Sequence, residues 1–87
     1  MPVIDQGNDD MPDEFVKVVK DPQDEEFCRF PVDDQGFLPQ KTVAAVYGRT
    51  SAMKFRIEGG WEVLRLRNGA FVAPQGGWGD TTYVIVK

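Results

Sequence analysis

The sequence predicts an α+β fold in which a single helix packs on one face of a curled mixed β-sheet. Three observations support this prediction. Short strand-like stretches recur along the 87 residues, only one segment has a convincing helical pattern, and glycine-containing turns separate the later strands. At this length the chain forms one small domain with a modest core. A binding surface is therefore expected in place of a deep, enclosed active site.

The first predicted elements are two strands joined by a turn. Residues 15–19 (FVKVV) are β-branched and partly alternate in polarity, and residues 27–30 (FCRF) can pair with them as a hairpin. Between the two strands, residues 21–26 (DPQDEE) form a turn built on Asp-Pro. Residues 32–36 (VDDQG) are a second break, which a glycine closes.

Residues 38–48 (LPQKTVAAVYG) are predicted to form the helix. Pro39 suits the first turn of a helix, where its missing N–H has no partner to lose, and Gly48 suits the C-terminal cap. Apolar side chains share one face of this helix: Val43, Val46 and Tyr47.

The rest of the chain is predicted to be strands and turns. Residues 53–57 (MKFRI) and 81–86 (TTYVIV) have strand patterns, and Glu58-Gly59-Gly60 is a turn. Residues 61–74 (WEVLRLRNGAFVAP) form a hairpin, because Asn-Gly between apolar-rich arms favours a two-residue turn with positive φ. The order strand, strand, helix and then several strands is typical of a β-grasp arrangement.

The segment APQGGWGD (73–80) places three glycines around Trp78, as either a ligand loop or a tight turn would. A phosphate-binding loop needs glycines that open a helix, whereas these open a strand. Glycine admits positive φ, and an indole can cover the bare backbone. The sequence therefore predicts a tight turn that a core tryptophan seals.

Charge is unevenly distributed along the chain. Residues 1–36 carry eleven acidic and three basic side chains, for a net charge of −8, and residues 37–87 carry three acidic and seven basic ones, for +4. If folding keeps these regions on different faces, copies attract one another end to end and repel side by side. Residues 1–14 are expected to be a disordered acidic tail, which leaves a domain at residues 15–87.

The residue inventory argues against catalysis and against a metal or cofactor site. The chain has no histidine to act as a base, and its single cysteine, Cys28, has no imidazole partner. No apolar run approaches the roughly 20 residues that cross a bilayer, and the acidic start lacks the features of a signal peptide. We expect a non-enzymatic, soluble domain without a cofactor in a reducing compartment.

The C-terminal half resembles the N-terminal domain of the TAR DNA-binding protein family. The stretch FVAPQGGWGDTTYVIV, preceded by LRLRNG, is similar to the family's Ala-Pro-x-x-Gly-Trp-Gly segment, which follows an Arg-Leu-x-x-Gly hairpin and leads into a Tyr-Val-Val strand. The stretch DDQGFLPQKTVAAVYG is similar to the family's acidic turn and Thr-Val-centred helix. The likeness covers residues 15–86.

The resemblance implies a ubiquitin-like fold, close to DIX-type domains, that associates head to tail into homodimers and longer chains. It also implies that RNA or DNA binds through domains outside this segment, and that the protein is nuclear and shuttles to the cytoplasm. In the family, acidic residues form one pole of the domain and arginines form the other. The matching positions here are Glu26, Arg29 and Asp33 on the first pole, and Glu62 and Arg65 on the second.

Two of these positions have exchanged charge relative to the family pattern, since an acid has become Arg29 and an arginine has become Glu62. If they face each other between copies, the opposite-sign pair is kept with its polarity reversed. Alternatively, both lie in solvent and their charges have drifted. Glu58 is the nearest counterpart of a family serine, and Val46 replaces a polar residue near the interface. The expected self-association interface comprises Glu26, Arg29, Asp33, Val46, Glu58, Glu62 and Arg65.

Two other functions stay open at this point. One is weak direct binding of single-stranded nucleic acid on a basic sheet with stacking aromatics. Its residues would be Lys54, Arg56, Arg65 and Arg67, with Phe55 and Trp61 between them. The acidity of the whole chain opposes this function. The other is a ubiquitin-like adaptor for a different protein, which would stay monomeric at every concentration.

Overall fold

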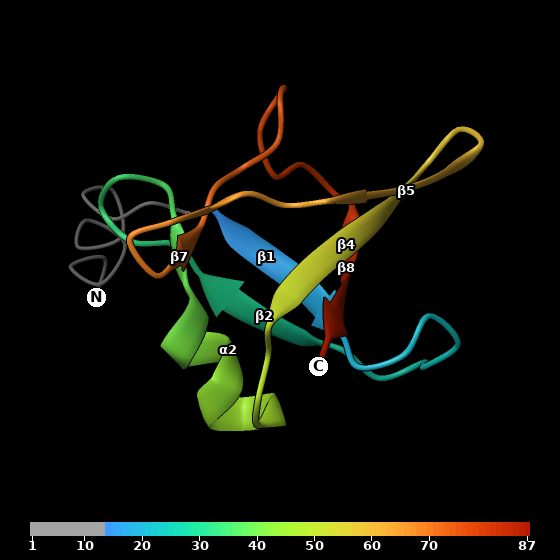
Figure 1. Cartoon of the computed structure of the whole chain (residues 1–87), viewed down its shortest axis with the longest axis horizontal. Helices are drawn as coiled ribbons and strands as arrows, with labels where there is room; N and C mark the ends of the chain where they lie inside the picture. Colours follow the sequence, from blue (N-terminus) through green and yellow to red (C-terminus); the bar gives the residue numbers. More distant parts are fainter. Residues whose placement is uncertain (1–13) are drawn as a thin grey trace, which may run out of the picture.

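The computed structural model describes residues 14–87 (Figure 1). The tail predicted for residues 1–14 lies, apart from Glu14, outside the described residues. The described chain is an α+β domain with one helix, a five-stranded mixed sheet and a three-stranded sheet. This architecture confirms the predicted fold class and is compatible with a ubiquitin-like β-grasp.

The five-stranded sheet contains all four strands predicted outside the Asn-Gly hairpin, with ends that differ by at most one residue. Its members are β1 (Phe15–Val19), β2 (Cys28–Pro31), β4 (Ala52–Ile57), β5 (Gly60–Val63) and β8 (Thr82–Val86). Their order is β2-β1-β8-β4-β5, in which β1 and β8 run parallel and the other neighbours run antiparallel. The two edges of the sheet are therefore β2 and β5.

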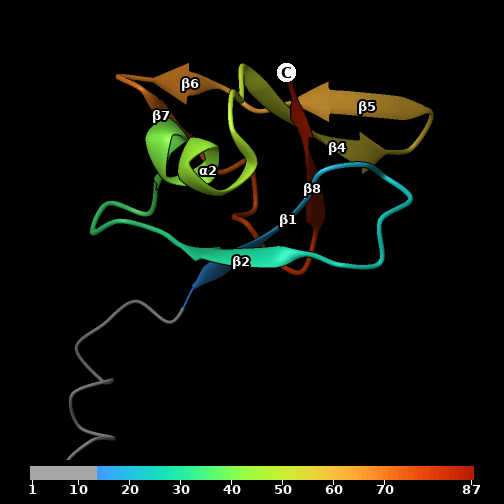
Figure 2. The same ribbon diagram turned by 90° about the horizontal axis from the view of Figure 1, so that it is seen from below.

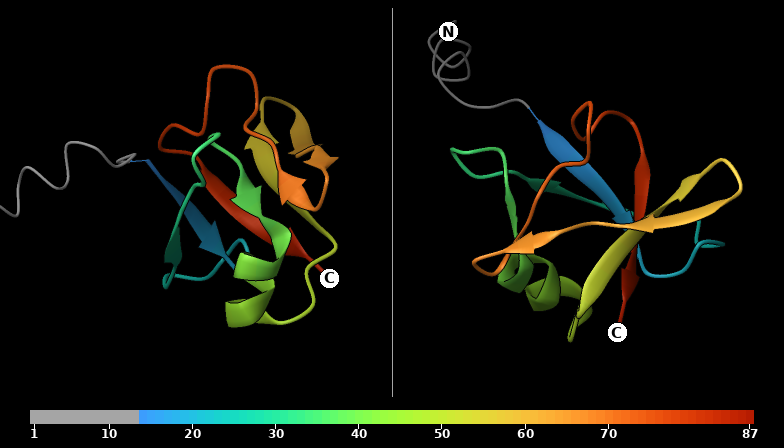
Figure 3. Two further views of the ribbon diagram at one scale, coloured as in Figure 1. Left: turned by 90° about the vertical axis from the view of Figure 1, so that its left-hand side faces the viewer. Right: turned by 45° about the horizontal axis from the view of Figure 1, so that its top comes forward.

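The sheet curls around the helix α2 (Gln40–Tyr47), which lies on its concave side (Figures 2 and 3). Tyr47 fixes the helix to the sheet. Its ring packs edge-on against Phe30 at 6.2 Å between centroids, and its hydroxyl donates a hydrogen bond to the carbonyl oxygen of Val18 at 3.0 Å. The predicted C-terminal cap is confirmed, because the N–H of Gly48 donates to the carbonyl oxygen of Ala44.

The helix begins two residues later than predicted. Residues Leu38–Pro39 form a short strand, β3, in which Leu38 lies opposite Phe71 and is fully buried. Pro39 is extended, with φ −61° and ψ 135°, so it precedes the helix and does not occupy its first turn. The N–H of Gln40 donates to the carbonyl oxygen of Gly69 at 2.9 Å. Pairing with a distant strand has overridden the local preference for a helix.

The Asn-Gly hairpin is confirmed at its turn and is shorter than predicted. Asn68 and Gly69 have φ values of 53° and 80°, as a two-residue hairpin turn requires, and they join β6 (Leu66–Arg67) to β7 (Ala70–Phe71). β3, β7 and β6 form the three-stranded sheet. The residues before this hairpin, Gly60–Val63, form β5 and pair with β4 in the five-stranded sheet. The chain passes between the two sheets at Leu64, which is buried.

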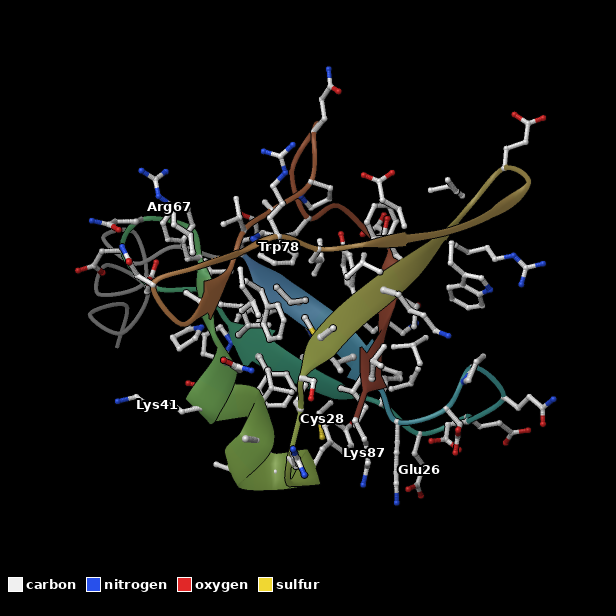
Figure 4. All side chains as sticks on the ribbon, viewed as in Figure 1. Glu26, Cys28, Lys41, Arg67, Trp78 and Lys87 are labelled. Carbon is white, nitrogen blue, oxygen red and sulfur yellow. The ribbon has the colours of Figure 1, made fainter. Side chains whose placement is uncertain are left out.

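The glycine-rich turn is sealed by Trp78, as predicted (Figure 4). The indole is 1% exposed, and its Nε1–H donates to the carbonyl oxygen of Gly36 at 2.9 Å. Its ring packs edge-on against Tyr83, whose hydroxyl donates to the carbonyl oxygen of Trp78 at 2.9 Å. Gly76 and Gly77 both have φ 91°, which a side chain would strain. One tryptophan thus joins two distant loops to the core.

Both tyrosines of the chain should ionise late in the folded protein. Burial, followed by the neighbouring Cys28 thiol, raises the pKa of Tyr47 to about 12, and burial also raises the pKa of Tyr83 above 10.0. Since each pKa is higher in the folded state, this stabilisation is present below pH 10 and is lost as the pH rises toward 12. We expect the ultraviolet absorbance of tyrosinate to lag behind that of the guanidinium-unfolded chain, which titrates at about pH 10. Coincident titration curves would contradict this.

Candidate functional site

Four of the seven residues predicted for self-association lie at the two edges of the five-stranded sheet. Glu26 lies two residues before β2 and Arg29 lies within β2, whereas Glu62 lies in β5 and Arg65 follows that strand. With adjacent strands about 4.8 Å apart, the width of the sheet separates the two groups. One copy therefore cannot bring them together, but two copies can.

Glu26 borders a shallow hollow beside β2, and we call this hollow the β2-edge surface. It is lined by Lys20, Asp24, Glu26, Phe27, Cys28 and Tyr47, and it encloses about 240 Å³. Phe27 is 47% exposed. Asp24 and Glu26 lie beside it, and the intervening Glu25 is also exposed. This surface combines negative charge with one projecting ring.

A second hollow lies beside the opposite edge and forms what we call the β5-edge surface. It encloses about 320 Å³, with lining residues from β4 and β5, from the residues that follow β5, and from the segment before the glycine-rich turn: Phe55, Glu62, Val63, Leu64, Arg65, Val72, Ala73, Pro74 and Gln75. Val63 is 56% exposed at this edge. Arg65 is the only basic residue of the lining, and Glu62 the only acidic one. An apolar bed with an arginine beside it suits an acidic, aromatic partner.

Arg29 and Glu62 lie on opposite faces of the sheet as well as at opposite edges. The Arg29 guanidinium carbon is 4.9 Å from the centre of the Phe15 ring, on the face turned away from the helix. Glu62 lies opposite Phe55, whose ring packs on Tyr83 in the core. The proposed pairing of Arg29 with Glu62 therefore requires two copies.

The other predicted interface residues have different environments. Val43 is buried and Tyr47 packs against the core, whereas Val46, which was predicted to share their helix face, is 56% exposed. Glu58 lies exposed in the turn between β4 and β5. Oδ1 of Asp33 accepts hydrogen bonds from the N–H groups of Gln35 at 2.9 Å and Phe37 at 2.8 Å. The Asp33 carboxylate thus holds its own turn, and its role at an interface stays a prediction.

The four residues predicted as a nucleic-acid surface are not brought together. Lys54 and Arg56 lie over the Trp61 ring, at 4.6 Å and 5.2 Å from its centre. Arg67 lies in β6 of the other sheet, and Arg65 lines the β5-edge hollow. Phe55 faces the core, since side chains alternate along β4, so it is not available for stacking.

Lys17 and Arg29 lie on the same side of the sheet as Lys54 and Arg56, and the sequence did not predict that these four cations come together. The Lys17 ammonium lies 4.5 Å from the centre of the Phe27 ring, and Arg29 lies over Phe15. All four cations belong to the side of the five-stranded sheet opposite α2, which we call the convex face. The sequence signal that could have predicted this was the alternation of residues within β1 and β2. Combined with the pairing of the two strands, it places Lys17 and Arg29 opposite each other on one face of the sheet.

The described residues contain no helix long and apolar enough to cross a membrane. Within the same range, no three or more candidate ligand side chains are grouped to hold a metal ion.

The model of the family described as TAR DNA-binding protein 43, N-terminal domain, matches residues 15–87. The chain belongs to this family. The match includes every described helix and strand, and it confirms the resemblance seen in the Gly-Trp-Gly segment. No curated protein matches the chain significantly. The two edge surfaces are thus features of one member of this family.

Proposed function

We propose that this domain is a self-association module. The β2-edge surface of one copy binds the β5-edge surface of the next. One observation carries the proposal: four of the residues expected at the interface, Glu26, Arg29, Glu62 and Arg65, lie at opposite edges of a single sheet, beside two unlike hollows. The matching family is a non-catalytic domain type, in keeping with a binding role.

Unlike surfaces lead to open assemblies. After two copies join, one β2-edge surface and one β5-edge surface are still free, so a third copy can add at either end. The chemistry of the two surfaces is complementary. Glu26 and the exposed Phe27 ring of one copy meet Arg65 and the apolar bed around Val63 of its neighbour.

Each junction is expected to be weak. Exposed ion pairs contribute about 0–1 kcal/mol each, and salt screens them. Weak junctions exchange quickly, yet they raise the avidity of a longer protein that carries nucleic-acid-binding domains outside this segment. Such a role fits a nuclear protein that shuttles to the cytoplasm.

Two half-blocked variants test the proposal. E26A/F27S weakens the β2-edge surface, and V63S/R65A weakens the β5-edge surface. All four side chains are exposed, so both variants should fold. In sedimentation velocity we expect each variant alone to stay near the 9.8 kDa monomer. Their equimolar mixture should form dimers and stop there, because one intact surface of each kind remains.

The matched control is K41A, which removes an exposed charge on α2 away from both sheet edges (Figure 4). It should assemble like the unmodified chain. Unhindered growth of either half-blocked variant would refute the proposed junction. A chain that is monomeric at every concentration would instead indicate an adaptor for a different protein.

A further inference from the structure

The convex face is an open basic surface in a domain that has no net charge overall. Residues 14–87 hold ten acidic and ten basic side chains, so their formal charges cancel. Four of the ten cations nevertheless lie on the convex face: Lys17, Arg29, Lys54 and Arg56. The five strands contain one acidic residue, Glu62, and it lies on the opposite face.

Strand register arranges the convex face in two adjoining rows. The first row contains Trp61, Arg56, Thr82, Lys17 and Arg29. In it Arg56 pairs with Trp61, and Lys17 pairs with Thr82 on one side and with Arg29 on the other. The second row runs through Val63, Lys54, Val84 and Val19. Val19 and Val84 are each 4% exposed, although neither belongs to the core cluster beneath the helix. The face thus has a closely packed apolar centre beside a row of cations.

Aromatic rings hold these cations in place. Lys17 lies on Phe27, Arg29 on Phe15, and both Lys54 and Arg56 on Trp61. Stacking against a ring orders a long side chain and leaves its N–H donors directed outward. Cations ordered in this way lose less conformational entropy when they bind carboxylates. The face therefore suits an extended acidic peptide with scattered apolar residues.

We propose that the occupant of the convex face is the chain's own acidic segment, residues 1–13. This segment holds four aspartates, which equal the net charge of −4 of the whole chain, and it has no basic residue. Met1, Val3, Ile4 and Met11 supply apolar groups. The charge of the segment therefore matches the four cations of the face in number and opposes them in sign.

The position and length of the segment permit this docking. The described chain begins at Glu14, and the next residue, Phe15, already lies under the guanidinium of Arg29 on the convex face. Thirteen extended residues span about 45 Å. Five strands at about 4.8 Å spacing extend for only about 19 Å, so the segment can cross the whole face. Covalent attachment gives it an effective concentration in the millimolar range.

The docked segment would occupy the convex face, which adjoins the two edge surfaces at Phe27 and Val63. It would neutralise the cations that attract other polyanions, and salt would release it, because exposed pairs are screened at distances of about 10 Å in 0.1 M salt.

Paramagnetic relaxation tests this proposal in the full chain. A nitroxide is attached through V3C in a C28S background, and amide signal loss is measured in dilute, low-salt protein. We expect broadening along β1, β8 and β4, and at the Trp61 indole, while the buried Trp78 indole and α2 keep their intensity. K54E/R56E should lower the docking equilibrium about fivefold. The charge-matched control K41E/R67E, at two exposed positions outside the convex face, should leave it unchanged.

Four outcomes would overturn the proposal. Broadening spread evenly over the surface would mean that the segment does not dock. Equal effects of the two charge-reversal pairs would mean that it responds only to net charge. Broadening in a mixture of labelled chain and unlabelled, isotope-enriched chain would place the segment on a second copy. Finally, oligo-dT affinity unchanged by D5N/D9N/D10N/D13N would mean that the four aspartates do not shield the face.

Discussion

Replacing Trp78 by alanine is expected to destabilise the domain by about 3–5 kcal/mol, which is the usual cost of removing a buried aromatic side chain. The indole is 1% exposed and packs on Tyr83. Its Nε1–H also holds the loop at Gly36. A domain of 87 residues has a free energy of unfolding of about 4–13 kcal/mol, so this single change can remove most of it.

Two milder variants separate the parts of this effect in urea unfolding followed by circular dichroism. W78F keeps an aromatic ring and leaves the Gly36 carbonyl without its donor, for an expected cost of about 1–3 kcal/mol. W61F changes the exposed tryptophan and should cost no more than about 0.5 kcal/mol. If W78A unfolded within about 1 kcal/mol of the unmodified chain, the sealed turn would not be a main source of stability.

Reversing the charge of Arg29 or Glu62 should weaken self-association, and reversing both should restore it. In R29E the new carboxylate faces Glu62 of the neighbour, and in E62R the new guanidinium faces Arg29. Replacing an attraction by a repulsion of exposed charges changes the association constant about tenfold. Sedimentation equilibrium of the unmodified chain, both single variants and the double variant measures this cycle.

The double variant distinguishes a direct Arg29–Glu62 pair from a general effect of charge, because only a direct pair restores association when both charges are reversed. K41E has the same change in charge as R29E and lies outside both edges, so it should assemble like the unmodified chain. Arg29 also belongs to the convex face, but Glu62 does not, so E62R tests the junction independently of that face. Equal assembly of all four proteins would place the two residues outside the junction.

The sequence was informative wherever structure depends on near neighbours. The alternation of apolar and polar residues identified the strand at Phe15–Val19. The Asn68-Gly69 dipeptide identified the turn between β6 and β7, because few other dipeptides accept two positive φ values. The glycines around Trp78 had one physical reading once they were seen to open a strand. These inferences need only a few consecutive residues.

Features that depend on distant pairing were beyond the sequence. Leu38–Pro39 reads as the start of a helix, but it pairs with a strand more than 30 residues further along the chain. The hairpin predicted for residues 61–74 is split between the two sheets, because its first residues form β5 and pair with β4. The strand order β2-β1-β8-β4-β5 could not be read locally either. That order alone places Glu26 and Arg65 at opposite edges and gathers the cations on the convex face.

The weight-average mass of the unmodified chain over a dilution series at low salt tests head-to-tail association most directly. We expect a value of 9.8 kDa at the lowest concentrations and a continuous rise past the dimer, without a plateau, toward about 1 mM. Added salt should reverse the rise. A mass that stays at 9.8 kDa throughout, or levels off at the dimer, would contradict an open assembly built from two unlike edges.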